Sequence, residues 1–394
     1  MNLTERWDAV MMPNYGTPPL ALDHGRGARV WDVDGAEYLD FVAGIAVSAL
    51  GHAHPRLVEA ITAQASRFLH TSNLAIHEPG VQLAERLTGL LGIPARVFFA
   101  NSGAEANECA LKLTRRYAHA TGRAEVVASN GGFHGRTLGA LSITGNPAKR
   151  EPFTPLPGGV RFVDHGDLDQ LRTAVGPQTA AVFVEPSLGE GGVVPLPSGF
   201  LTEVRRLCDE TGALMVVDEV QSAIGRVGHW FAVQAEGVRP DIITLAKGLG
   251  GGLPIGACLG VGDAGTLFGP GDHGSTFGAN PVACSAALAV LDTIEDEHLL
   301  DQVKRVGEHL GHRLDELDAP ILAGHRGSAL WRGLVLTGDH AGALEAAARR
   351  RGLLINAVKP DVIRLAPPLI VTEADVDEAV PIISAALDEV STDA

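Results

Sequence analysis

One lysine stands out as a candidate nucleophile: Lys247, in the segment ITLAKGLGGGLPIG (243–256). It follows a short apolar run that is typical of a buried strand, and four of the next five residues are glycine. Burial at the carboxyl end of a strand disfavours the ammonium form and leaves more of the free amine, which is a nucleophile. Most lysines are solvated surface groups, so this segment alone leaves Schiff-base chemistry and an ordinary surface lysine as alternatives.

A second apolar run, LMVV (214–217), is followed directly by Asp218, Glu219 and, two residues later, Gln221. Because the carboxyl ends of parallel strands meet at one edge of a sheet, Asp218 is expected near Lys247. A buried aspartate needs a cationic or protonated partner, and a pyridinium nitrogen would be one.

The run VFFA (97–100) precedes a candidate anion site. Ser102 and Glu105 fit a capping box, and the small residues Gly103 and Ala104 leave the first backbone N–H groups of the next helix open to a phosphate. An ordinary capped helix is the alternative. The lysine, the aspartate and this helix start would together serve the aldehyde, the ring nitrogen and the phosphate of pyridoxal phosphate.

Two glycine loops add further candidates. Phe133, His134 and Arg136 lie between glycines, where a ring can stack on a flat heterocycle and an arginine can bind a carboxylate. Phe133 could equally be a core residue. Glu185 and Glu190 follow the apolar run AVFV in the other loop. The chain has no GxxxxGK[ST] motif and no GxGxxG opening a helix, so ATP and dinucleotide sites are disfavoured.

Short apolar runs alternate with helical patterns over the middle of the chain, which predicts βαβ units and a largely parallel, buried sheet. The expected strands are 97–100, 125–129, 160–163, 181–184, 214–217 and 242–245. Residues 1–54 are expected to form short strands and turns, with a hairpin turn at Asp34–Gly35. After Asn280 one long helical stretch to about Asp318 should lead into a smaller α+β unit.

The composition, 45% hydrophobic and 20% charged over 394 residues, is that of a globular protein with roughly two domains. A net charge of −16 disfavours nucleic acid as a partner. Four scattered cysteines, no leader-like N-terminus and no long apolar run favour a cytoplasmic protein without a membrane span. His52 and His54, two positions apart, could be a pair of metal ligands, but a loop before a helix explains them equally well. No metal is therefore expected.

Nine motifs occur in one order along nearly the whole chain: WDVDGAEYLDF, GHAHP, NSGAEANE, FHGRT, EPSLGEGGV, DEVQSAIGRVG, LAKGLGGGLPIG, HGSTFGANP and RLAPPL. With them the sequence resembles the class III aminotransferases, which include acetylornithine, ornithine and 4-aminobutyrate aminotransferases. The resemblance implies the α/β fold of the fold type I pyridoxal-phosphate enzymes. A large cofactor domain (55–289) would carry the mostly parallel sheet, and a smaller α+β domain would come from both termini (1–54 and 290–394).

The resemblance also implies a role for individual residues. Lys247 would form the Schiff base with pyridoxal 5′-phosphate and shuttle a proton, and Asp218 would keep the ring nitrogen protonated. Gln221 would reach the phenolic oxygen, and Phe133 would stack on the ring. Three residues would bind the phosphate: Ser102, Gly103 and Ala104. Thr276 would reach the phosphate of the other subunit's cofactor, so the active unit would be a homodimer.

Substrate choice is assigned by resemblance to Arg136, Glu190, Arg364, Ser275 and Ile45. Arg364 would bind the α-carboxylate of glutamate or 2-oxoglutarate, and Glu190 would pair with it when the donor has no carboxylate beside its amine. Arg136 would bind the donor's far carboxylate. Ile45 stands where ornithine aminotransferases tend to have tyrosine, which favours an acylated α-amine.

These residues predict an enzyme that moves the δ-amino group of N2-acetyl-L-ornithine to 2-oxoglutarate, giving N-acetyl-L-glutamate 5-semialdehyde and glutamate for arginine biosynthesis. The alternatives are a transaminase for ornithine, 4-aminobutyrate or succinyl-diaminopimelate, an aminomutase, and a non-catalytic ligand-binding module on the same fold. Leu188, Ala75 and Ala279 depart from the usual family residues glutamine, tyrosine and glycine, which bears on substrate fit rather than on the chemistry.

Overall fold

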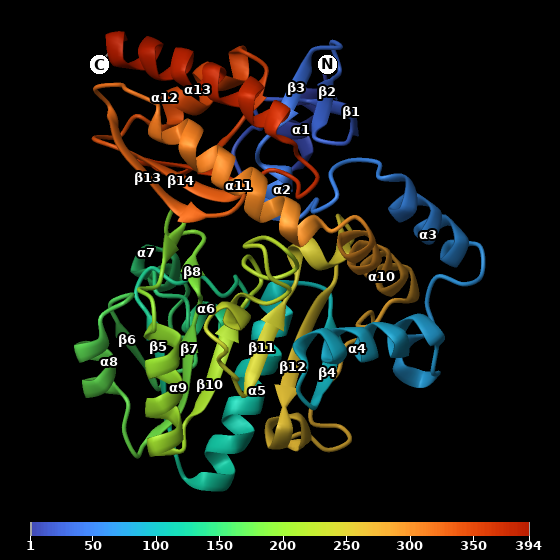
Figure 1. Cartoon of the computed structure of the whole chain (residues 1–394). Helices are drawn as coiled ribbons and strands as arrows, with labels where there is room; N and C mark the ends of the chain where they lie inside the picture. Colours follow the sequence, from blue (N-terminus) through green and yellow to red (C-terminus); the bar gives the residue numbers. More distant parts are fainter. Residues whose placement is uncertain (1, 394) are drawn as a thin grey trace.

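The structure is a computed structural model that describes residues 2–393. A large sheet flanked by helices forms one part, and two smaller sheets built from both ends of the chain lie beyond one edge of it (Figure 1). No helix among the described residues is both long and apolar enough to cross a membrane. The predicted α/β fold with a mostly parallel central sheet is confirmed.

The large sheet has seven strands in the order β4 (Ala95–Ala100), β12 (Gly256–Val261), β11 (Ile242–Leu245), β10 (Leu214–Asp218), β7 (Thr179–Val184), β5 (Glu125–Ser129) and β6 (Val160–Val163). The five strands from β11 to β6 pair in parallel. Strands β7, β10 and β11 are almost completely buried, as their apolar sequences require. All six predicted strands are therefore confirmed, within two residues at their ends.

The seventh strand, β12, is missing from the sequence prediction. It pairs antiparallel with both β11 and β4. Glycine weakens a strand pattern, and β12 contains Gly256 and Gly260, so the segment GACLGV does not predict a strand clearly. A Cβ atom at position 256 would lie 2.3 Å from the carbonyl oxygen of Ser102, so only glycine fits there. This close approach brings β12 against the start of α5 (Gly103–Thr121).

Helices cover the large sheet. α5 contacts β4, β7, β10, β11 and β12, while α9 (Phe200–Thr211) packs on β7 and β10, and α8 (Leu168–Ala174) packs on β6. α3 (Pro55–Ala65) and α4 (Glu78–Leu91) pack against α10 (Pro281–Asp296). The short elements are α6 (Leu138–Ser142), α7 (Pro147–Arg150), η1 (Ser72–Leu74), η2 (Glu151–Phe153), η3 (Ala232–Ala235), η4 (Lys247–Gly250), η5 (Gly262–Thr266), β8 (Ser187–Leu188) and β9 (Val194–Pro195).

The two ends of the chain meet in the smaller sheets. One sheet has the order β1 (Leu22–Arg26), β2 (Arg29–Asp32), β3 (Glu37–Asp40) and β15 (Leu353–Leu354), and the other β13 (Leu322–Ser328), β14 (Trp331–Leu336), β17 (Val362–Leu365) and β16 (Asn356–Lys359). Helices α11 (Leu299–Asp315), α12 (Ala341–Arg350) and α13 (Glu373–Asp393) complete this part. The domain division at 54/55 and 289/290 stays a prediction, and residue 290 lies inside α10.

Two sequence predictions about helices are wrong. The chain begins with α1 (Leu3–Val10) rather than with strands, because Asn2 and Glu5 form a reciprocal capping box. The single helical stretch from Asn280 to Asp318 is in fact two helices, α10 and α11. His298, with a φ of 54°, lies between them, and a left-handed residue interrupts the helical hydrogen bonds.

The segment from Ala43 to Ala46, labelled α2, is a left-handed turn. All four of its residues have positive φ angles, including Ile45 at 66°. A β-branched residue in this conformation is strained, and such strain clusters at functional sites. The next residue, Val47, lines the cavity described below.

Candidate active site

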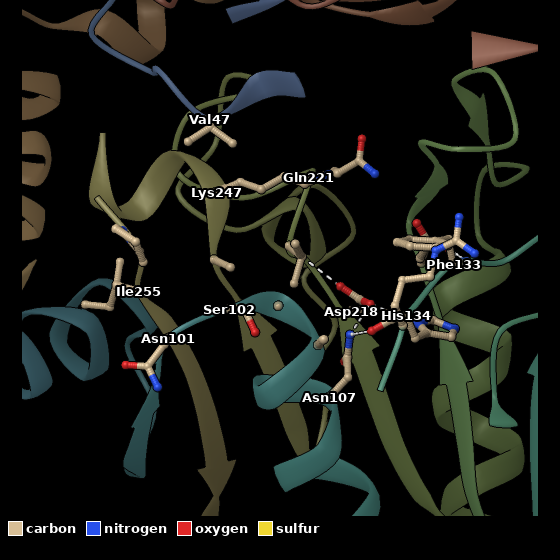
Figure 2. A pocket seen from close by; sticks show the side chains of 18 of the residues that line it. Val47, Asn101, Ser102, Asn107, Phe133, His134, Asp218, Gln221, Lys247 and Ile255 are labelled. Carbon is tan, nitrogen blue, oxygen red and sulfur yellow. Dashed lines mark hydrogen bonds and ion pairs between the residues drawn. The ribbon is translucent and has the colours of Figure 1, made fainter. Parts of the chain in front are cut away.

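A cavity of about 450 Å³ opens at the carboxyl ends of β10 and β11, beside the N-terminus of α5 (Figure 2). Figure 2 shows Asp218 between Asn107 and His134, with Lys247 and Gln221 further up the wall. Eight of the residues predicted from the sequence line this cavity: Ser102, Gly103, Ala104, Phe133, Arg136, Asp218, Gln221 and Lys247. The fold thus brings together side chains that are up to 145 positions apart in the chain.

Lys247 is the first residue of η4, two positions after the end of β11. Its backbone is left-handed, with a φ of 43°, which is uncommon for a residue other than glycine. Burial, and after it the positive charge of Arg364, lowers the pKa of Lys247 to about 7, although the nearby carboxylates Glu190 and Asp218 act in the opposite direction. A large fraction of Lys247 is therefore in the neutral amine form at physiological pH.

Asp218 is the last residue of β10 and lies opposite Thr244 of the parallel strand β11. Its Oδ2 atom accepts hydrogen bonds from Asn107 Nδ2 and from His134 Nδ1, both at 2.7 Å. Its Oδ1 atom accepts one from the backbone N–H of Val220 at 2.9 Å. Asp218 is only 4% exposed, so its carboxyl group is buried and held in place by three hydrogen-bond donors.

His134 is the nearest cationic partner of Asp218. Burial disfavours its imidazolium form, but the hydrogen bond and the charge of Asp218 outweigh burial and raise the pKa of His134. Its Nε2 atom is buried and has no hydrogen-bond partner among the described residues. The sequence places His134 in the right loop but gives no sign that it touches Asp218.

The two glutamates that follow the predicted strands turn in different directions. Glu185 lines the cavity, and its Oε1 atom accepts a hydrogen bond from the backbone N–H of Phe133 at 2.8 Å. Burial raises the pKa of Glu185 to about 7. Glu219 turns away and accepts hydrogen bonds from the backbone of Ala232 and Val233. Of Glu185 and Glu219, only Glu185 lines the cavity.

The start of α5 forms the candidate anion site. Ser102 is the N-cap, and its Oγ atom accepts a hydrogen bond from Glu105 N at 3.2 Å. The predicted capping box is only half formed, because the Glu105 carboxylate accepts from Asn101 N at 2.6 Å instead of from Ser102. A Cβ at position 103 would lie 2.9 Å from a methyl group of Val220. Small residues therefore keep the N–H groups of this helix end accessible to an anion.

Arg364 of β17 enters the site from the smaller part of the molecule. Its Nη1 atom lies 2.7 Å from Glu190 Oε1 and 3.2 Å from Gln221 Oε1, and its Nη2 atom donates to Asn356 Oδ1 at 2.8 Å. Burial opposes the charged form of Glu190, but the charge and the hydrogen bond of Arg364, together with the nearby lysine charges, outweigh burial and lower the pKa of Glu190. The predicted pairing of the arginine with the glutamate is present.

Phe133 and Arg136 both line the cavity. Phe133 is partly buried, and the guanidinium carbon of Arg136 lies 5.6 Å from the centre of its ring. Arg136 is exposed and has no ion pair among residues 2–393. It is therefore free to bind an anion.

Five predicted site residues are not among those that line the cavity: Glu190 and Arg364, which meet at its side, and Ile45, Ser275 and Thr276. Ile45 is 43% exposed in the left-handed turn before Val47. Thr276 is exposed, and the Oγ atom of Ser275 accepts a hydrogen bond at 3.2 Å from Nδ2 of Asn101, which lines the cavity. His52 and His54 are also remote, since His52 pairs with Asp40 at 2.8 Å. Among the described residues, no three His, Cys, Asp or Glu side chains are placed to hold a metal ion.

Ala279 has a φ of 61°, which lies in the left-handed region that favours glycine. We expect Ala279→Gly to stabilise the protein by about 0.5–1 kcal/mol, because glycine adopts this conformation without steric strain. Thermal unfolding followed by calorimetry checks this. The neighbouring Gly278→Ala is the control and should destabilise, since its Cβ would lie 2.2 Å from the carbonyl oxygen of Phe99. A lower unfolding temperature for Ala279→Gly would contradict the strain argument.

Asn107 is the site residue that sequence reasoning missed. It donates to Asp218 and to the carbonyl oxygen of His134, and its own carbonyl accepts from Thr244 Oγ1 at 2.8 Å. The signal was its position four residues after Gly103, which places it on the same face of α5 and toward the strand ends. Asn107 thus fixes the orientation of the aspartate.

Known proteins with the same architecture can now be compared. The chain matches the family described as Aminotransferase class-III over residues 10–387. It is 54% identical to the acetylornithine aminotransferase of Mycolicibacterium smegmatis over the full length of both chains. It is 55% identical to the acetylornithine aminotransferase of Streptomyces coelicolor, covering 93% of this chain and 90% of that protein.

Solved structures agree. The ornithine aminotransferase of Toxoplasma gondii, in a structure with partial occupancy of PLP at its active site, superposes with a TM-score of 0.95 at 33% identity, covering 99% of this chain and 94% of that one. The acetylornithine aminotransferase of Elizabethkingia anophelis superposes with a TM-score of 0.87 at 32% identity, covering 97% of each chain. The match over nearly the whole chain and the cavity built from the family's motifs lead to one conclusion: the chain belongs to the class III aminotransferases.

Proposed function

We propose that this enzyme is a pyridoxal-phosphate-dependent aminotransferase that moves the δ-amino group of N2-acetyl-L-ornithine to 2-oxoglutarate. The products would be N-acetyl-L-glutamate 5-semialdehyde and L-glutamate, and the reaction would serve arginine biosynthesis. The observation that carries the proposal is one cavity that contains Lys247, whose pKa is lowered, and the buried Asp218. Beside this cavity Arg364 pairs with Glu190 and contacts the cavity residue Gln221. The names of the relatives support this choice of donor.

The residues of the cavity fit pyridoxal 5′-phosphate. Lys247 supplies a neutral amine for its aldehyde, Asp218 a buried carboxylate for its ring nitrogen, and the first turn of α5 the N–H groups for its phosphate. Phe133 offers an aromatic face and Gln221 an amide for the phenolic oxygen. The cofactor, when bound, supplies an electron-poor ring that stabilises negative charge on the substrate carbon next to the nitrogen.

Lys247 has a second task once the substrate amine has taken its place on the cofactor. Its Nζ atom would remove the proton from the substrate carbon that carries the amine and return a proton on the other side of the nitrogen. A general base works best with a pKa near the working pH, and the pKa of about 7 for Lys247 meets that condition. Asp218, held in place by its three hydrogen-bond donors, would hold the proton on the ring nitrogen.

Glu190 and Arg364 would let one cavity accept two kinds of substrate. N2-acetylornithine has no carboxylate beside its reacting amine, and with this donor the guanidinium of Arg364 keeps Glu190 as its anion. Glutamate brings its own α-carboxylate, which would displace Glu190. An arginine cannot lose its proton, so a 2% exposed guanidinium needs an anion in both cases.

A comparison of donors tests the proposed function. With 2-oxoglutarate as acceptor, we expect kcat/KM to be highest for N2-acetylornithine among a set with ornithine, 4-aminobutyrate and succinyl-diaminopimelate. Ile45 offers no hydroxyl to a free α-ammonium, which disfavours ornithine. A higher kcat/KM for free ornithine would overturn the choice of donor, and turnover without 2-oxoglutarate would indicate an aminomutase.

The lowered pKa of Lys247 predicts how the cofactor-free protein takes up pyridoxal phosphate. The neutral amine is the reactive form, so the rate should rise with pH up to about 7 and then level off. A lysine with the ordinary pKa of about 10.4 would give a rate that still rises above pH 9. Stopped-flow absorbance of the bound cofactor measures the rate, and the Lys247→Ala variant supplies the baseline. A continued rise above pH 9 would contradict the lowered pKa.

We also infer a homodimer in the cytoplasm. Three large apolar residues on neighbouring segments are strongly exposed: Leu74 (95%), Ile76 (93%) and Phe277 (59%). Asn73 Nδ2 donates to the carbonyl oxygen of Gly278 at 3.1 Å, which joins the two segments. A second copy covering this face would bury them and bring Thr276 toward the partner's cavity. Sedimentation velocity distinguishes the dimer from a monomer.

Four buried free cysteines suit a reducing compartment.

A further inference from the structure

Lys149, the third residue of α7, has no role in the proposed function. Its Nζ atom lies 4.8 Å from the centre of the Phe133 ring, and the guanidinium carbon of Arg136 lies 5.6 Å from the same point. One aromatic ring at the cavity wall therefore has two cationic groups beside it, and each comes from a different loop.

Backbone hydrogen bonds hold these two loops together. Gly131 N donates to the carbonyl oxygen of Gly145 at 2.8 Å, and Gly145 N donates to that of Gly132 at 2.9 Å. A Cβ atom at position 145 would lie 2.0 Å from the carbonyl oxygen of Ser129, so only glycine allows this approach. The start of α7 is thus held against the loop of Arg136, which keeps Lys149 and Arg136 on neighbouring segments.

Neither cation has a carboxylate within 4.0 Å among residues 2–393. Lys149 is partly buried. Burial lowers the pKa of Lys149, the charge of Glu190 opposes this, and the charges of Arg136 and Arg364 lower it further. The exposed Arg136 and the partly buried Lys149 repel each other, and an anion that binds both removes the repulsion.

We propose that Lys149 and Arg136 together bind the substrate carboxylate that lies far from the reacting amine. The inference rests on the proposed function, in which this group is the α-carboxylate of N2-acetylornithine or the side-chain carboxylate of glutamate. Lys149 would then be a specificity-determining residue that favours donors with a distant carboxylate over simple amines. It touches the substrate but not the reacting atoms.

The next residue on α7 gives a matched control. Arg150 lies over a different ring, with its guanidinium carbon 4.1 Å from the centre of Phe162 in β6. Phe162 does not line the cavity. Arg150→Met therefore removes a cation from the same short helix without changing the charge beside Phe133.

The test uses the holoenzyme with Lys149→Met, Lys149→Arg and Arg150→Met. Glutarate, an unreactive dicarboxylate, serves as the probe in titration calorimetry. Lys149→Met should raise the Kd of glutarate and the KM of N2-acetylornithine about tenfold each, with kcat unchanged, because one charge-assisted hydrogen bond is lost. Lys149→Arg should restore most of the affinity, and Arg150→Met should match the wild type.

N-acetyl-1,4-diaminobutane, which is the donor without its carboxylate, separates recognition from folding. Its kcat/KM should be the same for Lys149→Met and wild type. Equal losses with both donors, or an unchanged Kd of glutarate, would overturn the proposal. A KM effect confined to glutamate and 2-oxoglutarate would also overturn the proposal, and it would indicate that Lys149 acts through its charge interaction with Glu190. If the wild type does not use N2-acetylornithine at all, the proposed function fails, while the glutarate titration still decides the role of Lys149.

Discussion

Replacing Lys247 with alanine should lower kcat with N2-acetylornithine and 2-oxoglutarate by at least about 10⁴-fold. The variant loses both the amine that holds the cofactor and the group that moves the proton, and a positioned general base alone is worth about 10²–10⁴-fold. Initial rates of glutamate formation, followed to long times with concentrated enzyme, measure the loss. The effect belongs to kcat because the interaction acts in the reaction rather than in substrate binding.

The exposed lysine Lys359, on β16, gives the control for this variant. Lys359→Ala removes the same group from the surface and should leave kcat unchanged. Alanine at position 247 keeps a Cβ in the same left-handed conformation, so the backbone strain is unchanged. Retention of wild-type turnover by Lys247→Ala would exclude the lysine from the chemistry.

Replacing Asp218 with asparagine should lower kcat by about 10²–10³-fold. The amide has the shape of the carboxylate but no charge, so it cannot keep the ring nitrogen of the cofactor protonated, and removal of one preorganised electrostatic contact typically costs this much. The substitution also removes the anion that raises the pKa of His134, so the variant should show a shifted pH dependence of kcat. Steady-state rates between pH 6 and 9 measure both effects.

Asp209 provides the matched control. Its carboxylate pairs with Arg205 at 2.8 Å on the surface and lies on α9, away from the cavity lining. Asp209→Asn removes one negative charge and should leave both the rate and its pH dependence as in the wild type. The same loss in both variants would point to a general effect of charge on the protein rather than to the ring nitrogen.

The sequence predicted the centre of this site for a physical reason. Lys247, Asp218 and Gln221 come directly after apolar runs, and parallel strands place such positions along one edge of a sheet. β10 and β11 are indeed neighbours in the sheet. Residues directly after parallel strands lie along one edge of the sheet whatever the directions of their side chains, so their position in the sequence predicts that they are neighbours.

Other parts of the site depend on directions that a linear pattern does not contain. Glu185 and Glu219 both follow a strand, yet only Glu185 turns into the cavity. Arg364 reaches the site from a different sheet, so only the resemblance could assign it. Asn107 occupies a helix position that predicts burial but not the hydrogen bond to Asp218.

Transfer of a labelled nitrogen tests the central claim most directly. The enzyme is incubated with 2-oxoglutarate and N2-acetylornithine that carries ¹⁵N only at the δ-amine, and the glutamate formed is analysed by mass spectrometry. The account predicts that the ¹⁵N appears in glutamate in equal amount to the semialdehyde produced, and that Lys247→Ala gives none. Unlabelled glutamate, or ¹⁵N released as ammonia, would contradict it.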